Sequence, residues 1–218
     1  KEKVRGAVAI GRVFAVAQNY RAHAAEMGSK PRERNHPYFF TKFTDAVLTC
    51  PLGESCLVPY PIATKDFHFE TELVFMIGKS GHNITIHDAL HHISHCLVGI
   101  DLTRRDLQAE SKINSMPWDM GKAFSPVNAV IGEAIPFNEL DHDAYLETTV
   151  NGEKRQRAPV SDMIWDVQQL VHFLSCYQHL RVGDLVFTGT PAGVGALQKG
   201  DRLKGTIGSL PPVCFEIP

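Results

Sequence analysis

The sequence lacks an excess of charge of either sign, and it lacks long hydrophobic runs. Its 218 residues include 22 Lys and Arg against 24 Asp and Glu, a net charge of −2. A chain that binds nucleic acid would carry a basic excess gathered on one face. No apolar run approaches the roughly 18–20 residues that span a membrane, and the N-terminal residues do not resemble a signal peptide. We therefore expect a soluble globular protein that binds neither nucleic acid nor membranes.

Cysteine pairs and repetitive segments are missing too. The five cysteines are odd in number, and no two of them form a C-x-x-C pair. Secreted chains of this size more often carry an even, closely spaced set of cysteines. We therefore expect five reduced, mostly buried thiols and a cytoplasmic location. The chain also shows no low-complexity tract, internal repeat or obvious linker.

Short strand-like segments predominate in what the chain does contain. We expect strands at 13–17, 38–40, 66–75, 97–102, 145–150 and 153–156, helices from a cap at Asn19 to 26, at 86–97, at 104–112 and from a cap at Ser161 to 177, and an exposed loop at 28–37. Asn151-Gly152 is the strongest hairpin signal, because it supplies the two positive φ angles of a type I′ turn. Without regular βαβ alternation, this pattern favours a strand-dominated α+β fold, a mixed sheet sandwich or roll.

Two carboxylates share one face of the strand predicted at 66–75. Glu70 and Glu72 stand roughly 7 Å apart, since side chains two residues apart point the same way. This face is either simply solvated or gathered around a divalent cation such as Mg²⁺, which takes oxygen ligands. Asp101 ends a second apolar segment and needs a partner if buried. That partner is either a neighbouring arginine, Arg104 or Arg105, or the same metal.

His23 and Glu26 are three residues apart, so a helical turn places them within reach of each other. The pair is either a general base oriented by a carboxylate or an ordinary exposed helix pair. Residues 189–195 form a Gly-rich loop without the pattern of a phosphate loop. Its backbone N–H groups and the Thr190 hydroxyl are candidates for binding a substrate carboxylate.

Four histidines gather at positions 87–95. His91 and His95 have the i, i+4 spacing of helical zinc ligands. No glutamate accompanies them as it does in H-E-x-x-H, and Leu90 and Ile93 already supply an apolar face. We therefore interpret His87, His91, His92 and His95 as a solvated helix face.

Taken in order, these residues and their neighbours resemble the fumarylacetoacetate hydrolase family, from about Val13 to Ile217. The matching segments are NYRAHAAEMG (19–28), FFTK (39–42), HFETEL (68–73), DLTRRDLQ (101–108), PWDMGK (117–122), VNGE (150–153) and GDLVFTGTPAGVG (183–195). The segments DLTRRDLQAE, PWDMGKAF and SDMIW look most like the acylpyruvate-type members that act on fumarylpyruvate. One difference is Ala17-Gln18, where the family usually has Gly-Arg, which predicts a strained Cβ in a tight turn and one cation fewer.

The resemblance implies a fold, an assembly and a set of site residues. It implies a mixed β-sandwich roll, one catalytic domain over residues 1–218, and a homodimer. By the resemblance, the metal ligands for Mg²⁺ or Mn²⁺ are Glu70, Glu72 and Asp101, the catalytic residues are His23, Glu26 and Lys122, and the substrate-binding residues are Tyr20, Arg105, Gln108 and Thr190.

The resemblance also implies a reaction. It is the hydrolysis of a carbon–carbon bond in a 2,4-dioxo acid, with fumarylpyruvate cleaved to fumarate and pyruvate in the gentisate pathway of aromatic catabolism. Three alternatives stay open: a broader acylpyruvate hydrolase, an oxaloacetate decarboxylase that passes through the same pyruvate enolate, and a metal-binding relative with little activity.

Overall fold

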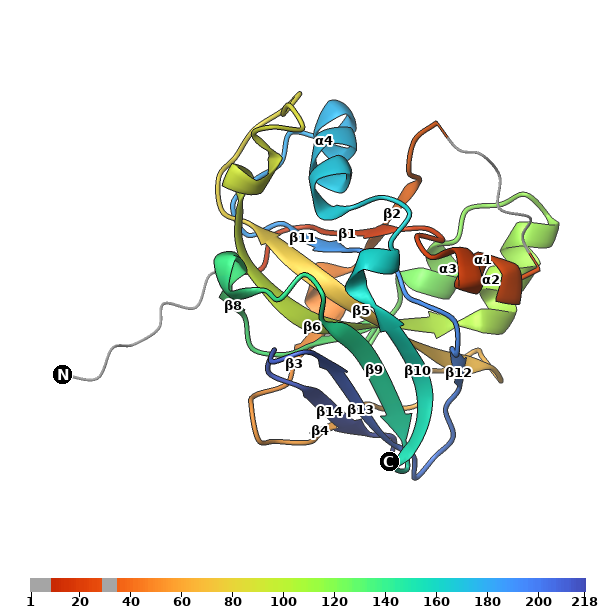
Figure 1. Ribbon diagram of the computed structural model, residues 1–218. Helices are drawn as coiled ribbons and strands as arrows, with labels where there is room; N and C mark the ends of the chain where they lie inside the picture. The colour runs from red at the N-terminus through yellow and green to blue at the C-terminus, as the bar shows by residue number, and fades with distance from the viewer. Residues whose placement is uncertain (1–8, 29–34) are drawn as a thin grey trace.

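The computed structural model describes residues 9–28 and 35–218, and strands predominate in it (Figure 1). The strands are β1 (Val13–Val16), β2 (Phe39–Lys42), β3 (Val47–Thr49), β4 (Cys56–Leu57), β5 (Phe67–Ile77), β6 (Ile93–Arg104), β7 (Ala129–Ile131), β8 (Ile135–Pro136), β9 (Tyr145–Val150), β10 (Glu153–Pro159), β11 (Leu185–Phe187), β12 (Gly195–Ala196), β13 (Arg202–Ile207) and β14 (Val213–Glu216). The helices are α1 (Arg21–Glu26), α2 (Arg105–Ile113), α3 (Asp119–Lys122) and α4 (Val167–Tyr177), with 3₁₀ turns η1 (Thr44–Ala46), η2 (Ala89–His92), η3 (Phe137–Glu139) and η4 (Val160–Asp162).

The strands form two sheets. The nine-stranded sheet follows the order β2-β1-β11-β5-β6-β7-β3, with β12 beside β5 and β8 beside β6. The five-stranded sheet follows the order β10-β9-β13-β14-β4. Each sheet contains parallel and antiparallel pairs. The expected strand-dominated α+β fold with mixed sheets is therefore confirmed.

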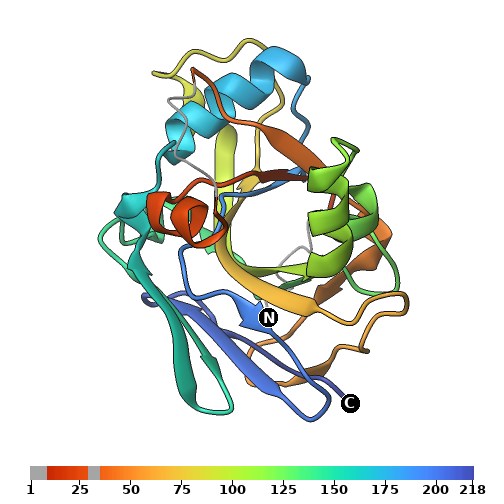
Figure 2. The same ribbon diagram turned by 90° about the vertical axis from the view of Figure 1, so that its right-hand side faces the viewer.

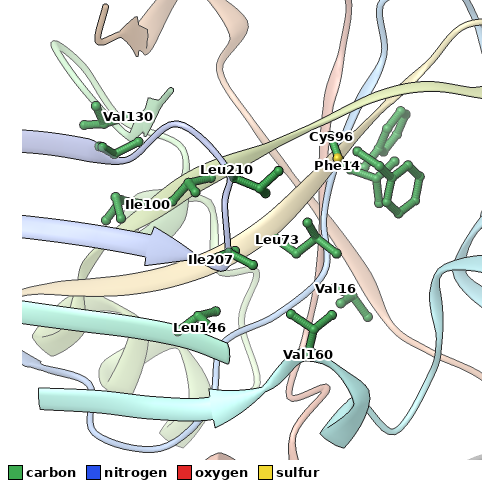
Figure 3. Packing of buried hydrophobic residues seen from close by; sticks show 14 of the residues in the cluster. Phe14, Val16, Leu73, Cys96, Ile100, Val130, Leu146, Val160, Ile207 and Leu210 are labelled. Carbon is green, nitrogen blue, oxygen red and sulfur yellow. The ribbon is translucent and has the colours of Figure 1, made fainter. Parts of the chain in front are cut away.

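The hydrophobic core lies between the two sheets. Leu73 of β5 and Ile100 of β6 belong to one buried cluster with Leu146 of β9 and Ile207 of β13 (Figure 3). At Gly205 of β13 the sheets approach so closely that an added Cβ would lie 2.9 Å from Ile100 Cδ1. The five-stranded sheet therefore covers one face of β5 and β6. Their other face carries the functional residues and, further along, a second buried cluster that includes Val74, Met76 and Leu97.

The predicted hairpin is confirmed. β9 and β10 pair antiparallel on either side of the turn, and Asn151 and Gly152 have φ angles of 53° and 82°. The polar helix expected at 104–112 is also present, as α2.

The helix predicted at 86–97 is wrong. The chain makes only the short turn η2 there and continues as β6 from Ile93. Leu97 lies opposite Val74 of β5, and His95 lies opposite Met76. Pairing with the long neighbouring strand outweighs the helical spacing of these residues, because β-structure depends on partners distant in the sequence.

Both predicted helix caps are wrong. Tyr20, not Asn19, occupies the cap position of α1, and the Asn19 side-chain nitrogen instead donates to the carbonyls of Trp165 (2.9 Å) and Thr188 (2.8 Å). The helix expected after a cap at Ser161 begins five residues later than predicted, at Val167. Asp166 caps α4 through a capping box with Gln169 at its third position.

The remaining expectations concern the thiols and one loop. All five cysteines are free, but only Cys50 and Cys96 are buried, and Cys176 is exposed. The expectation of mostly buried thiols is therefore wrong. Most of the loop expected at 28–37 lies outside the described residues. Across the described ranges, no helix has the length and apolarity needed to cross a membrane.

Candidate active site

The register between β5 and β6 brings three buried acids together. Glu70 lies directly opposite Asp101, and Glu72 shares the face of Glu70 because it is two residues further along the strand. The three side chains, which we call the acidic cluster, place ligand oxygen atoms within 4.8 Å of one another. They are 5%, 1% and 0% exposed for Glu70, Glu72 and Asp101. A solvated strand face is therefore excluded.

Two lysines compensate part of this negative charge. The Lys122 ammonium at the end of α3 donates to Glu70 Oε2 (2.8 Å), Asp101 Oδ2 (2.9 Å) and Thr103 Oγ1 (2.7 Å). The Lys42 ammonium at the end of β2 donates to Asp101 Oδ1 at 2.6 Å. The partners of Asp101 are thus lysines rather than the arginines next to it in sequence. Lys42 was not singled out from the sequence, although it ends the FFTK segment of the resemblance.

Arg105 at the start of α2 belongs to a chain of polar side chains. It pairs with Glu70 and donates from Nη1 to Gln108 Oε1 at 2.8 Å. Its Nε also donates to His68 Nδ1 at 3.4 Å, and His68 Nε2 lies 2.8 Å from Asp66 Oδ1. Burial and the positive charge of Arg105 lower the pKa of His68. The neutral imidazole therefore accepts from Arg105 and donates to Asp66.

The acids of the cluster differ in charge compensation. Burial opposes ionisation of Glu70, but Lys122 and Arg105 outweigh it and hold the pKa of Glu70 well below its ordinary value. Glu72 accepts the Gly189 N–H at 2.7 Å and has no ion-pair partner among the described residues. Burial and the charges of Asp101 and Glu70 raise its pKa well above the ordinary value.

The acidic cluster fits a divalent cation. Carboxylate oxygens are the ligands that Mg²⁺ and Mn²⁺ prefer, and the buried carboxylate of Glu72 forms no ion pair with any residue that the structure describes. Within residues 9–28 and 35–218, no other group of three or more His, Cys, Asp or Glu side chains places its ligand atoms close enough to hold a metal.

The histidines at 87–95 do not form the predicted helix face. His91 and His92 lie in η2 and His95 lies in β6. His92 is buried, and its Nδ1 donates to the Lys79 carbonyl at 2.7 Å. The four histidines therefore differ in exposure, with His87 and His91 exposed, His92 buried and His95 partly buried, and they do not form one solvated surface.

His23 and Glu26 meet on α1 as the spacing predicts. His23 Nδ1 lies 3.2 Å from Glu26 Oε2, and the imidazole is 6% exposed. Glu26 Oε1 also accepts the Gly193 N–H at 2.9 Å. The Gly-rich loop thus donates to protein carboxylates at two positions, Gly189 and Gly193, and these N–H groups are not available to a substrate carboxylate as the sequence suggested.

A pocket lies over the acidic cluster and is lined by residues of α1, α2 and α3. In Figure 2, α1 (red) lies on one side of the long strands, and α2 and α3 (green) lie on the other side. It is lined by Val16, Ala17, Gln18, His23, Met27, Phe40, Glu70, Glu72, Arg105, Gln108, Lys112, Trp118, Lys122, Gly189 and Thr190. The structure therefore brings most of the expected site residues to one cavity, with Asp101 directly beneath Lys122. Lys112 and Trp118 were not expected there.

Two residues expected to bind substrate, Thr190 and Tyr20, have surroundings that differ from this expectation. The Thr190 hydroxyl donates to the Thr71 carbonyl and accepts from Gln156 Nε2, both at 2.7 Å. Tyr20 is 2% exposed and does not line the pocket, and its hydroxyl has no hydrogen-bond partner among the described residues. Burial and the negative charge of Glu72 raise the pKa of Tyr20 above its ordinary value.

The strain expected from Ala17 lies one residue further on. Gln18 adopts a positive φ of 54°, whereas Ala17 does not. Both residues line the pocket. The backbone at position 17 therefore does not adopt the left-handed conformation in which the Cβ of alanine would be strained.

Comparison with known proteins gives a family and three informative relatives. The family model for the fumarylacetoacetate hydrolase C-terminal domain matches residues 12–217. A solved structure of fumarylpyruvate hydrolase from Pseudomonas aeruginosa in complex with Mn²⁺ and pyruvate is 40% identical, with a TM-score of 0.94 over 99% of this chain and 93% of that one. The mitochondrial oxaloacetate decarboxylase of Dictyostelium discoideum is 34% identical over 88% of this chain and 87% of its own length. The oxaloacetate tautomerase YcgM of Escherichia coli is 36% identical over 90% of this chain and 88% of its own length.

Proposed function

This chain belongs to the fumarylacetoacetate hydrolase family, and we propose that it cleaves fumarylpyruvate to fumarate and pyruvate. Membership of this family indicates a hydrolase that acts on carbon–carbon bonds. The observation that carries the proposal is one pocket in which the acidic cluster lies beside Lys122 and the His23–Glu26 pair. The 40% identity to a fumarylpyruvate hydrolase with Mn²⁺ and pyruvate bound supports this substrate over shorter dioxo acids.

The cofactor in this proposal is Mg²⁺ or Mn²⁺. Glu70, Glu72 and Asp101 would hold the ion, since they offer buried oxygen ligands within 4.8 Å of one another. When bound, it supplies a Lewis acid for the oxygen atoms of the pyruvyl end of the substrate.

His23 is the proposed general base. Glu26 accepts from His23 Nδ1 at 3.2 Å, which leaves Nε2 to take a proton from water. The hydroxide adds to the distal carbonyl carbon, and the bond from that carbon to the methylene carbon breaks. The electron pair of that bond passes to the methylene carbon as the enolate of pyruvate. The other fragment carries a new carboxyl group, which releases its proton to water, and it leaves as fumarate. The enolate then takes the proton from His23 to give pyruvate.

Three further residues are proposed to act on the charges of the substrate. The Lys122 ammonium is buried at the floor of the pocket, where its positive charge stabilises the developing enolate. Arg105 and Gln108, which are hydrogen-bonded to each other, bind the carboxylate of the pyruvyl end. Thr190 lines the same pocket, whereas Tyr20 does not, so we propose no substrate contact for Tyr20.

Oxaloacetate is the second candidate substrate. The relatives named for its decarboxylation and tautomerisation are 34% and 36% identical, close to the value for the fumarylpyruvate hydrolase. Oxaloacetate presents the same 2-oxo acid end, and it passes through the same kind of enolate. It needs no room for a distal acyl group.

We also propose one catalytic domain over residues 1–218, a homodimeric assembly and a cytoplasmic role in the catabolism of aromatic compounds. Light scattering coupled to size exclusion measures the assembly directly. A monomeric mass for fully active protein would contradict the dimer.

The test of the function is a set of parallel turnover assays. Loss of the ultraviolet absorbance of the dioxo acid is followed for fumarylpyruvate and acetylpyruvate, and oxaloacetate consumption is followed beside them, each with Mn²⁺, Mg²⁺ or a chelator. We expect chelator-sensitive turnover that prefers fumarylpyruvate at least tenfold. Preference for oxaloacetate would move the assignment to the second candidate, and turnover unaffected by chelator would refute both.

A further inference from the structure

Lys112 is a cation of the pocket that the proposed mechanism does not use. Arg105, Gln108 and Lys112 lie on α2 at positions i, i+3 and i+7 and all line the pocket. This spacing places the three side chains along one face of the helix. Lys112 is therefore about two turns further along α2 than Arg105, and it lines the same cavity.

Among residues 9–28 and 35–218, the other cations at the floor and wall of the pocket each contact an acid. Lys42 and Lys122 bond to Asp101, and Arg105 pairs with Glu70. Lys112 forms no ion pair with any carboxylate in the part of the chain that the structure describes. Its ammonium lies instead 5.1 Å from the centre of the Trp118 ring.

The environment of Lys112 carries surplus positive charge. Burial, together with the charges of Arg105 and Lys122, lowers the pKa of Lys112. An ammonium held by an aromatic face and surrounded by other cations is stabilised when an anion binds beside it. A divalent cation on the acidic cluster would add to this surplus.

The length of the helix face suits a ligand with an anion at each end. Seven residues of α-helix separate Arg105 and Lys112 by about 10 Å along the axis. A seven-carbon chain has six carbon–carbon bonds of about 1.5 Å between its terminal carboxyl carbons, so it spans at most roughly 9 Å. The four-carbon chain of oxaloacetate spans about half of that.

We propose that Lys112, held against Trp118, binds the distal carboxylate of the substrate and makes the pocket selective for 2-oxo acids with a carboxylate at both ends of a seven-carbon chain. This inference rests on the proposed function for the position of the pyruvyl end. Lys112 is then a specificity-determining residue that contributes to binding rather than to bond cleavage.

The test is a binding comparison that needs no turnover. Calorimetry on the Mn²⁺-loaded protein compares 2-oxoheptanedioate with 2-oxoheptanoate, which differ only in the distal carboxylate. We expect the wild type to bind the dicarboxylate at least tenfold more tightly. Lys112→Met removes this preference, Lys112→Arg retains most of it, and Lys199→Met, at an exposed lysine, leaves it unchanged.

Kinetics provide the second readout. Lys112→Met is expected to raise the KM for fumarylpyruvate about 10- to 50-fold, the effect of losing a hydrogen bond between charged groups, and to change kcat/KM for acetylpyruvate less than twofold. Equal losses on both substrates, or a dicarboxylate preference that survives in Lys112→Met, would overturn the inference. If the binding preference behaves as expected but no dioxo acid is hydrolysed, the proposed reaction fails and the role of Lys112 stands.

Discussion

Replacing Glu72 by glutamine is expected to stabilise the metal-free protein and to reduce its stabilisation by Mn²⁺. The wild-type carboxylate is 1% exposed and receives one backbone N–H, from Gly189 at 2.7 Å. A glutamine oxygen can accept that same hydrogen bond. The substitution therefore removes a buried negative charge while keeping the shape of the side chain and its hydrogen bond.

The size of the effect follows from the spacing of the acidic cluster. At 4.8 Å, the outer limit of the separations between ligand atoms, two negative charges repel by roughly 3.5 kcal/mol at an effective dielectric constant of about 20. The nearby ammonium of Lys122 offsets part of this repulsion. We expect Glu72→Gln to raise the free energy of unfolding by about 2 kcal/mol, which is roughly 4–8 °C in Tm for a protein of this size.

The advantage of Glu72→Gln depends on pH. Folding raises the pKa of Glu72 well above its ordinary value of 4.5. Between pH 4.5 and the raised pKa, the folded state therefore binds more protons than the unfolded state does. The stability of the metal-free wild type therefore decreases as pH rises from about 4.5 through the raised pKa. Glu72→Gln loses this dependence, so its advantage is absent below about pH 4.5 and complete only above the raised pKa.

Mn²⁺ is expected to reverse the order of stability. At a concentration 100 times its Kd, a ligand stabilises the folded state by about 2.7 kcal/mol, and the variant retains only two of the three carboxylates. Thermal unfolding of chelator-treated and Mn²⁺-loaded protein between pH 4 and 8 measures both effects. Glu110→Gln, at an exposed carboxylate on α2, serves as the control and should stay within about 0.5 kcal/mol of wild type. A metal-free Glu72→Gln less stable than wild type at pH 7.5, or equally stabilised by Mn²⁺, would refute the reasoning.

Three further predictions concern the base, a loop and a cap. His23→Ala should lower turnover about 10²- to 10⁴-fold and leave the Mn²⁺-induced rise in Tm unchanged; a parallel loss of both would contradict its role as base. Gly193→Ala places a Cβ against the Arg155 carbonyl at a φ of +96°, whereas Gly200→Ala meets open space at +89°. Urea unfolding should show about 1 kcal/mol lost at Gly200 and at least twice that at Gly193, and similar losses would be inconsistent with this contact. Asp166→Ala removes the capping box of α4 and should lower the free energy of unfolding by about 1 kcal/mol in the same assay. An unchanged free energy of unfolding would contradict a stabilising role for this cap.

Much of the local structure follows from short-range pattern. The alternation along 66–75 predicts β5 and places Glu70 and Glu72 on one face, because side-chain direction in a strand depends only on residue parity. The i, i+3 spacing of His23 and Glu26 predicts their contact on α1, and Asn151-Gly152 predicts the turn between β9 and β10. These features need no partner distant in the sequence.

The tertiary structure decided which of these residues act together. The register of β5 on β6 places Asp101 opposite Glu70, and a shift by one residue would move it to the face that packs on the smaller sheet. Lys42 reaches Asp101 across 59 positions of sequence, and Asn19 bonds to Trp165 instead of capping α1. Sequence spacing cannot supply such pairings, since they arise from the need to satisfy buried charges and polar groups wherever the chain brings them. The sequence by itself determined the strand faces, the hairpin and the His23–Glu26 contact. Only long-range packing decided that, within the described part of the chain, Glu72 forms no ion pair with a cation and Lys112 forms none with an acid.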